Sequence, residues 1–181
     1  MTTAGGAGRP RVLAVDDRRE NLLALQAILE GLAVEVVSVT SGEDALKRLL
    51  TDDYAVILLD ANMPGMDGFE TAGHVKQRER TRHIPILFLT AVDYDPHLAF
   101  RGYQAGAVDY ITKPFDPWVL RSKVGVFVDL WLVHVRLAEQ AEECARLRAL
   151  IEDAVELIDD GGAGPATLTQ VRERLAAARE G

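Results

Sequence analysis

Apolar runs alternate with helical apolar patterns along roughly the first 115 residues. Five short runs of apolar or β-branched residues predict strands at 11–15, 34–39, 56–59, 84–89 and 108–111. Between them, apolar side chains at helical spacing predict helices at about 19–30, 43–50, 69–80 and 97–104. This alternation predicts an α/β fold, in which a doubly wound, five-stranded parallel sheet is covered by helices on both faces.

The pattern changes after Asp116, which is a good helix N-cap and is followed by Pro117, a good first helical residue. Leu120, Val124 and Phe127 have the spacing of side chains that pack on the sheet. A heptad pattern then follows, with Leu130, Leu137, Cys144, Ile151 and Ile158 at position a and Val133, Gln140, Leu147 and Ala154 at position d.

This pattern predicts one helix of about 42 residues, which would run for roughly 60 Å at 1.5 Å per residue. That is longer than a domain of this size is wide. We therefore expect a second copy of the chain to cover its far half as a coiled coil, although an amphipathic helix folded onto its own domain is the alternative. The predicted organisation is a disordered lead-in at 1–10, an α/β domain at 11–129, a coiled-coil extension at 130–160, and a linker with a short terminal helix at 161–181.

Composition and charge narrow the function classes. Hydrophobic residues make up 48% of the chain, which excludes wholesale disorder. The 28 Asp and Glu residues outnumber the 20 Lys and Arg residues, and the net charge of −8 argues against direct nucleic-acid binding. The single cysteine, the lack of a long apolar run and the lack of an apolar leader predict a cytoplasmic protein with no membrane contact.

Polar side chains stand at the carboxyl ends of four predicted strands: Asp16 and Asp17, Asp60, Thr90, and Lys113. These ends converge on one edge of a doubly wound sheet, where ligands bind. Three carboxylates repel one another unless a hard cation such as Mg²⁺ lies between them. A lysine and a hydroxyl beside them suit a phosphoryl group, so the pattern predicts an aspartate that accepts phosphate.

Over about residues 11 to 130, the chain resembles the receiver domain of two-component response regulators. The resemblance rests on Asp16-Asp17, on Asp60 with the loop 62–68 (Asn-Met-Pro-Gly-Met-Asp-Gly), on Thr90-Ala91, and on residues 110–115 (Tyr-Ile-Thr-Lys-Pro-Phe). It implies a flavodoxin-like fold and phosphorylation of Asp60 by a phosphohistidine. It also implies that Asp17, Asp60 and the backbone carbonyl of Asn62 ligate Mg²⁺ directly, with Asp16 acting mainly through a water.

The resemblance also assigns the residues around the phosphoryl group. Lys113 would pair with its oxygens, and Thr90 would hydrogen-bond to them. The bond between Lys113 and Pro114 resembles the family's cis peptide. Tyr110 resembles the family's switch aromatic, which turns inward as Thr90 is drawn to the phosphate; ordinary strand packing is the alternative role for Tyr110.

The expected partners are a sensor histidine kinase or phosphotransfer protein, a second copy of the chain through the C-terminal helix, and an unidentified output protein. We expect no output domain after the long helix, and no enzyme activity beyond self-phosphorylation and dephosphorylation. Two alternatives stay open. In the first, the chain would be a phosphate shuttle or sink in a phosphorelay. In the second, it would be the receiver portion of a longer signalling protein.

Overall fold

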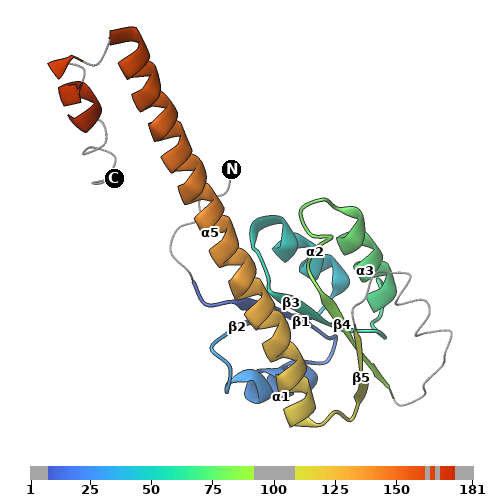
Figure 1. Ribbon diagram of the computed structural model, residues 1–181. Coiled ribbons are helices and arrows are strands. Elements are labelled where there is room, and N and C mark those ends of the chain that lie inside the picture. The colour runs from blue at the N-terminus through green and yellow to red at the C-terminus, as the bar shows by residue number, and fades with distance from the viewer. Residues whose placement is uncertain (1–7, 92–108, 162–163, 166–167, 174–181) are drawn as a thin grey trace. The chain divides into compact units, whose positions relative to one another are not determined.

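The computed structural model describes residues 8–91, 109–161, 164–165 and 168–173 (Figure 1). Within these residues the order of elements is β1 (Arg11–Val15), α1 (Arg19–Leu29), β2 (Glu35–Val39), α2 (Gly42–Thr51), β3 (Val56–Asp60), α3 (Gly68–Gln77), β4 (Ile86–Ala91), β5 (Asp109–Lys113) and α5 (Pro117–Gly161). The helix predicted at 97–104 lies outside the described residues.

The strands form one parallel sheet in the order β2-β1-β3-β4-β5. Helices α1 and α5 cover one face of this sheet, and α2 and α3 cover the other (Figure 1). The doubly wound, five-stranded α/β fold predicted from the alternation of elements is therefore confirmed. β3 lies at the centre of the sheet and all five of its residues are buried, as its continuous apolar run indicates.

Two apolar layers hold the helices on the sheet, because successive strand side chains point to opposite faces. Leu13 and Phe88 pack in the layer that contains Leu49 of α2 and Val75 of α3. Ala14, Leu58 and Leu87 pack in the opposite layer, with Leu25 of α1 and Leu120 of α5. Each layer is closed by side chains of the same domain, so this part of the chain has a core of its own.

Side-chain caps fix the starts of two helices, and the cap on α5 is the one that the sequence predicts at Asp116. The backbone N–H of Asp44 donates to Ser41 Oγ at 3.1 Å at the start of α2. The N–H of Trp118 donates to Asp116 Oδ1 at 2.7 Å at the start of α5. Each side chain satisfies a backbone N–H that has no partner inside the first turn of its helix.

The predicted bounds at 69–80 and 84–89 were wrong. α3 ends at Gln77 because the Thr81 hydroxyl donates to the Val75 carbonyl at 2.7 Å, which closes the last turn with a side chain. The N–H of Ile84 donates to the Thr81 carbonyl at 3.0 Å, so Ile84 belongs to the turn and β4 begins at Ile86.

Strands β4 and β5 also extend further than predicted at their carboxyl ends. Thr90 pairs with Thr112 and Ala91 with Lys113, so the parallel ladder continues through the residues that the sequence placed just after the strands. Thr90 and Lys113 therefore stand on the sheet itself. Their backbone positions are fixed by strand pairing.

The chain divides into two compact units, Met1–Val133 and His134–Gly181, and α5 contributes residues to both. In the first unit, Leu120, Val124 and Val128 of α5 are buried. In the second, every described side chain of α5 is exposed or partly exposed, and residues 168–173 are helical. No helix in the described ranges has the length and apolar character needed to cross a membrane.

Candidate functional site

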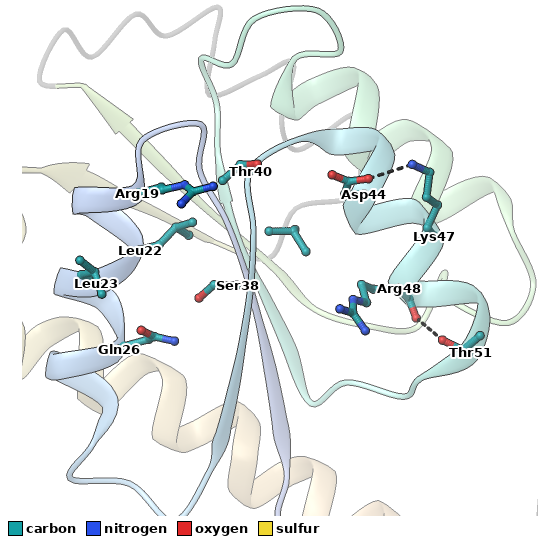
Figure 2. Close-up of a pocket in the computed structure, with 11 residues that line it drawn as sticks. Arg19, Leu22, Leu23, Gln26, Ser38, Thr40, Asp44, Lys47, Arg48 and Thr51 are labelled. Atoms are coloured by element: carbon teal, nitrogen blue, oxygen red, sulfur yellow. Dashed lines mark hydrogen bonds and ion pairs between the residues drawn. The ribbon is translucent and has the colours of Figure 1, made fainter.

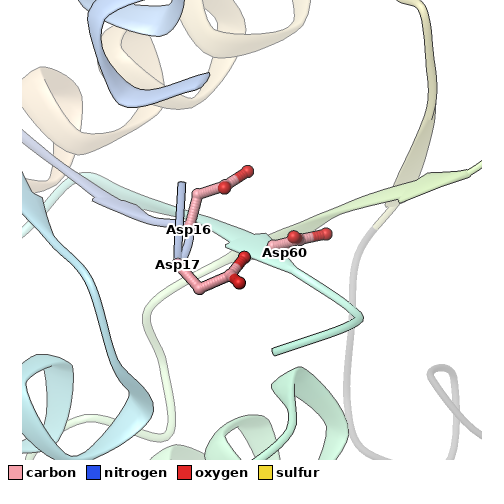
Figure 3. Close-up of side chains that lie close together, drawn as sticks. All are labelled: Asp16, Asp17 and Asp60. Atoms are coloured by element: carbon pink, nitrogen blue, oxygen red, sulfur yellow. The ribbon is translucent and has the colours of Figure 1, made fainter. Parts of the chain in front are cut away.

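Three carboxylates meet at the carboxyl ends of β1 and β3. These strands are neighbours, with Val15 opposite Leu59, so the residues that follow Val15 lie beside the end of β3. One carboxylate oxygen from each of Asp16, Asp17 and Asp60 lies within 4.8 Å of the other two (Figure 3). Asp16 and Asp60 are buried, whereas Asp17 is exposed to solvent. The cluster expected from the sequence therefore forms, with one member open to solvent.

Lys113 reaches this cluster from β5, on the far side of β4. Its Nζ lies 2.7 Å from Asp16 Oδ2 and 3.2 Å from Asp60 Oδ1. One ammonium group thus bridges the two buried carboxylates. Two negative charges packed together at this depth need such a counterion, because burial removes the water that would otherwise solvate them.

Asn21 is a member of the site that the sequence did not reveal. Its Nδ2 donates to Asp16 Oδ1 at 2.8 Å and to Asp16 Oδ2 at 2.9 Å. The backbone N–H of Arg18 also donates to Asp16 Oδ1, at 2.9 Å. Together with Lys113, these donors occupy both oxygens of the fully buried Asp16 carboxylate. Asn21 stands five residues after Asp16, and only the observed turn from β1 into α1 aims its amide at that side chain.

The environment of Asp60 works against its ionised form. Burial raises the pKa of the Asp60 carboxyl above its usual value, and the negative charge of Asp16 acts in the same direction. The charge of Lys113, its hydrogen bond to Asp60 and a hydrogen bond from the backbone N–H of Asn62 oppose this rise in pKa. The site holds three carboxylates against one lysine, so a further positive charge would stabilise it.

Gly68 lets the loop after β3 close tightly against Asp60. A Cβ at position 68 would lie 2.1 Å from the backbone carbonyl oxygen of Asp60, so no larger residue fits there. The N–H of Gly68 donates to the Ala61 carbonyl at 3.2 Å. Asp67 caps α3 by accepting from the N–H of Glu70 at 2.7 Å. The loop that carries Asn62 is therefore fixed at both ends.

Thr90 and Tyr110 lie on β4 and β5, next to the strand ends that carry the site. Both residues are partly buried, and the Tyr110 ring stacks on Phe88 with centroids 5.5 Å apart. This stacking is what the packing role of Tyr110 predicts, and the switch role stays a prediction. The Lys113–Pro114 peptide bond is cis, as the resemblance implies. The side chain of Ala91 lies outside the described residues.

The family model and the related sequences point to the same protein family. The sequence model of the response regulator receiver domain matches residues 12–125. The chain is 34% identical to the response regulator PleD of Caulobacter vibrioides over 166 residues, which is 92% of the chain. It is also 35% identical to the sensor histidine kinase GacS of Pseudomonas protegens over 150 residues. Only 11 residues precede the region that matches the family model. A 166-residue match to PleD must therefore also include residues well beyond 125.

Solved structures agree with these sequences. The chemotaxis protein CheY4 of Vibrio cholerae superimposes with a TM-score of 0.62 at 30% identity, covering 66% of this chain and 99% of that one. A signal receiver domain of a histidine kinase from Syntrophus aciditrophicus gives a TM-score of 0.62 at 32% identity, covering 66% of this chain and 90% of that one. The chain spans 36% of the length of PleD and 16% of GacS. The chain belongs to the response regulator receiver domain family, and Asp16, Asp17, Asp60 and Lys113 meet where its strands end.

Proposed function

We propose that the chain receives a phosphoryl group on Asp60 from the phosphohistidine of a sensor kinase or phosphotransfer protein. The observation that carries this proposal is the bridge from Lys113 Nζ to Asp16 and Asp60 beside the third carboxylate, Asp17. A nucleophilic carboxylate, a cation for the phosphoryl oxygens and a set of hard oxygen ligands are what transfer to an aspartate requires.

The donor set fits Mg²⁺. Three carboxylates within 4.8 Å of one another are hard oxygen ligands, and they share the single positive charge of Lys113. Both oxygens of Asp16 already accept hydrogen bonds. Asp17, Asp60 and the carbonyl of Asn62 would therefore hold the ion directly, and Asp16 would act through a water. When bound, Mg²⁺ would supply the positive charge that lets an anionic phosphoryl group approach these carboxylates.

The transfer itself uses the Asp60 carboxylate as nucleophile. One Asp60 oxygen forms a bond to phosphorus while the bond from phosphorus to the donor's imidazole nitrogen breaks. The electron pair of that bond returns to the imidazole, which takes up a proton from solvent. Lys113, which already lies 3.2 Å from Asp60 Oδ1, pairs with the phosphoryl oxygens as they arrive. Asn21 and the Arg18 N–H keep the Asp16 carboxylate in place when Lys113 moves.

Thr90 and Tyr110 would read out the modification. Thr90 stands on β4 opposite Thr112, and β5 carries both Tyr110 and Lys113. A hydrogen bond from the Thr90 hydroxyl to the phosphoryl group would free space that the Tyr110 ring enters by turning inward. The change would then appear on the surface formed by β5 and the first part of α5.

We propose that the chain signals to its output protein through a parallel homodimer formed by α5. At the predicted a and d positions, Leu130 and Val133 of the first unit are 54% and 50% exposed. In the second unit, Leu137, Leu147 and Ile151 are 57%, 49% and 60% exposed. Apolar side chains at this spacing are stable in water when a second helix covers them. A phosphorylation-dependent change in the packing of this dimer would be presented to an output protein.

A parallel register makes two further statements about the interface. It sets Glu143 of one chain against Arg148 of the other, an attractive pair that contributes a few tenths of a kcal/mol when exposed. It also sets Cys144 of one chain opposite Cys144 of the other. Cys144 is a free, exposed thiol within the described part of the chain. Mild oxidation of the purified protein should therefore cross-link the dimer. In the cell, a single cysteine that stays reduced fits a cytoplasmic setting.

A phosphotransfer profile tests the central proposal. We expect at least one histidine kinase of the host to transfer its phosphoryl group to the wild-type chain in Mg²⁺, and neither EDTA-treated protein nor Asp60→Asn to accept it. Transfer that continues in Asp60→Asn would place the acceptor elsewhere. The lifetime of the product separates the two roles open to the chain: loss within seconds to minutes favours a phosphate sink, whereas a longer lifetime favours a signalling module.

The relatives also favour a role within a longer protein. Because the chain spans only 36% of PleD, a receiver of this kind can be one part of a larger signalling chain. In that case, the proposed dimer would transmit its change to whatever the longer protein carries, and the chain itself would have no enzyme activity beyond gain and loss of its phosphoryl group.

A further inference from the structure

The edge of the sheet at β2 forms a groove that the receiver chemistry does not use. A cavity of about 790 Å³ lies along this edge, between α1 and α2. Figure 2 shows Arg19, Leu22, Leu23 and Gln26 of α1 on one side, Ser38 of β2 and Thr40 just after this strand in the middle, and Asp44, Lys47 and Arg48 of α2 on the other. The groove is therefore lined by two helices and floored by an edge strand.

The floor of the groove offers unpaired backbone groups. β2 pairs only with β1 in the part of the chain that the structure describes. The N–H of Glu35 donates to the Pro10 carbonyl at 2.9 Å, and the Val39 carbonyl accepts from the N–H of Asp16 at 3.3 Å. Backbone groups of a strand alternate between its two edges, so those of Val36 and Ser38 point away from β1, into the groove.

This edge lacks the protection that exposed strands usually carry. Its sequence, Glu-Val-Val-Ser-Val, contains no proline or lysine, and its three central residues are only partly buried. Its one charged residue, Glu35, lies at the start of the strand and is paired with Arg11 of β1 at 2.9 Å. The Ser38 hydroxyl is buried and makes no hydrogen bond among the described residues. The other edge strand, β5, carries Asp109 and Lys113, whose side chains form ion pairs. β2 is thus the edge that is ready to accept another strand.

The side walls of the groove carry positive charge. Arg19, Lys47 and Arg48 line it, and Asp44 is its one acidic residue, paired with Lys47 at 2.8 Å. Neither Arg19 nor Arg48 forms an ion pair with any acidic side chain in the described ranges. On a chain of net charge −8, two unpaired arginines flanking an open strand edge select an acidic partner.

We propose that this groove binds an extended acidic peptide segment of a partner protein, which pairs with β2 as a sixth strand. The peptide's acidic side chains would face Arg48 on the α2 wall, and its apolar ones would face Leu22 and Leu23 on the α1 wall, which also carries Arg19. A small anion could pair with the arginines, but it cannot donate a hydrogen bond to the outward carbonyls of Val36 and Ser38. A helix has no free backbone groups for this edge. An extended peptide supplies donors and acceptors in alternation.

The test uses the full chain and a fluorescent seven-residue peptide in which glutamate and valine alternate. Fluorescence anisotropy gives the dissociation constant, and NMR of the labelled protein reports the amides of Val36 and Ser38. We expect both amides to shift on binding and Arg19→Glu/Arg48→Glu to weaken binding at least tenfold, which corresponds to about 1.4 kcal/mol. The matched control is Arg78→Glu/Arg82→Glu, which makes the same charge change at exposed residues outside the groove. The control should weaken binding less than about twofold.

Two further reagents separate strand pairing from charge alone. A peptide N-methylated at alternate residues keeps its carboxylates but cannot donate to β2, and Ser38→Pro removes an outward N–H without touching the β1 ladder. Both should lose binding, while far-UV circular dichroism and phosphorylation of Asp60 stay unchanged. Equal binding of the methylated peptide, equal weakening by the control variant, or no binding at millimolar peptide would overturn the proposal.

Discussion

The receiver unit and the second unit of this chain both contain regularly spaced apolar side chains, but among the described residues only the receiver covers its own. Leu58 of β3 is fully buried between helices of its own domain. Leu147 of α5 has a similar side chain and is 49% exposed. The difference teaches where each part obtains its stability. The receiver is stabilised by its own core, whereas the exposed heptad positions of α5 would gain stability from the partner helix that we propose.

The largest expected effect comes from placing charge on the predicted seam. Leu147→Asp/Ile151→Asp would bury carboxylates in an apolar interface, which costs several kcal/mol, so the dimer should dissociate. Light scattering at micromolar protein should give a dimer for the wild type and a monomer for this variant. Ala145→Asp/Ala149→Asp adds the same charge at heptad positions b and f and should remain dimeric. A wild type that is already monomeric would remove the coiled coil from the account.

Single truncations separate the two regions by their dependence on concentration. Leu58→Ala should cost about 2–5 kcal/mol of unfolding free energy at every protein concentration, because it leaves a cavity in a closed core. Leu147→Ala should lower stability only where the dimer forms, since its contacts are with the partner. Urea unfolding over a wide range of protein concentrations measures both. If Leu147→Ala were equally destabilising in dilute monomer, its side chain would be covered by its own chain.

A smaller effect is expected inside the receiver, at Asn21. Asn21→Ala removes both amide hydrogen bonds to the buried Asp16 carboxylate, which should cost about 1–3 kcal/mol. Added Mg²⁺ should recover part of that loss, because positive charge at the cluster replaces the missing donors. Thermal unfolding with and without Mg²⁺ checks this, with exposed Gln77→Ala as the control. An Asn21→Ala protein as stable as the wild type would mean that the amide does not hold Asp16.

The smallest stability effect concerns the charge of Asp60. Its pKa is raised by burial, so over the range between the unfolded and folded pKa values the native state binds more protons, and stability falls as pH rises. Asp60→Asn removes this cost and should stabilise the metal-free protein at neutral pH, by less than the loss expected for Asn21→Ala. The gain should shrink as pH falls through the raised pKa. A gain that stays constant as pH falls would mean that Asp60 is not strained by its charge.

The sequence predicted what depends on residue type and spacing. The apolar run before Asp60 predicted the central strand. Asp16, Asp17, Asp60 and Lys113 meet as expected, because the carboxyl ends of parallel strands lie at one edge of the sheet. It could not predict contacts that depend on side-chain direction. The hydrogen bond from the Thr81 hydroxyl to the Val75 carbonyl, which closes the end of α3, cannot be predicted from helix propensities.

Asn21 and Gly68 illustrate the same limit within the site. Nothing in the local pattern around Asn21 distinguishes it from any polar residue in the first turns of a helix. Its role appears only once the turn after β1 is known. From the sequence, Gly68 is predicted to be a turn residue. The reason that only glycine fits there is its close approach to the Asp60 carbonyl, which is seen only in the folded loop.

The most direct test of the account is the intact mass of the full chain after incubation with acetyl phosphate, a donor that needs no cognate kinase. With Mg²⁺ present, the wild-type protein should gain the mass of one phosphoryl group, and it should gain none in excess EDTA. Asp60→Asn, which keeps the size of the side chain and removes the nucleophile, should gain none in either condition. A phosphoryl group on Asp60→Asn, or on the wild type in EDTA, would contradict the assignment of Asp60 as the magnesium-dependent acceptor.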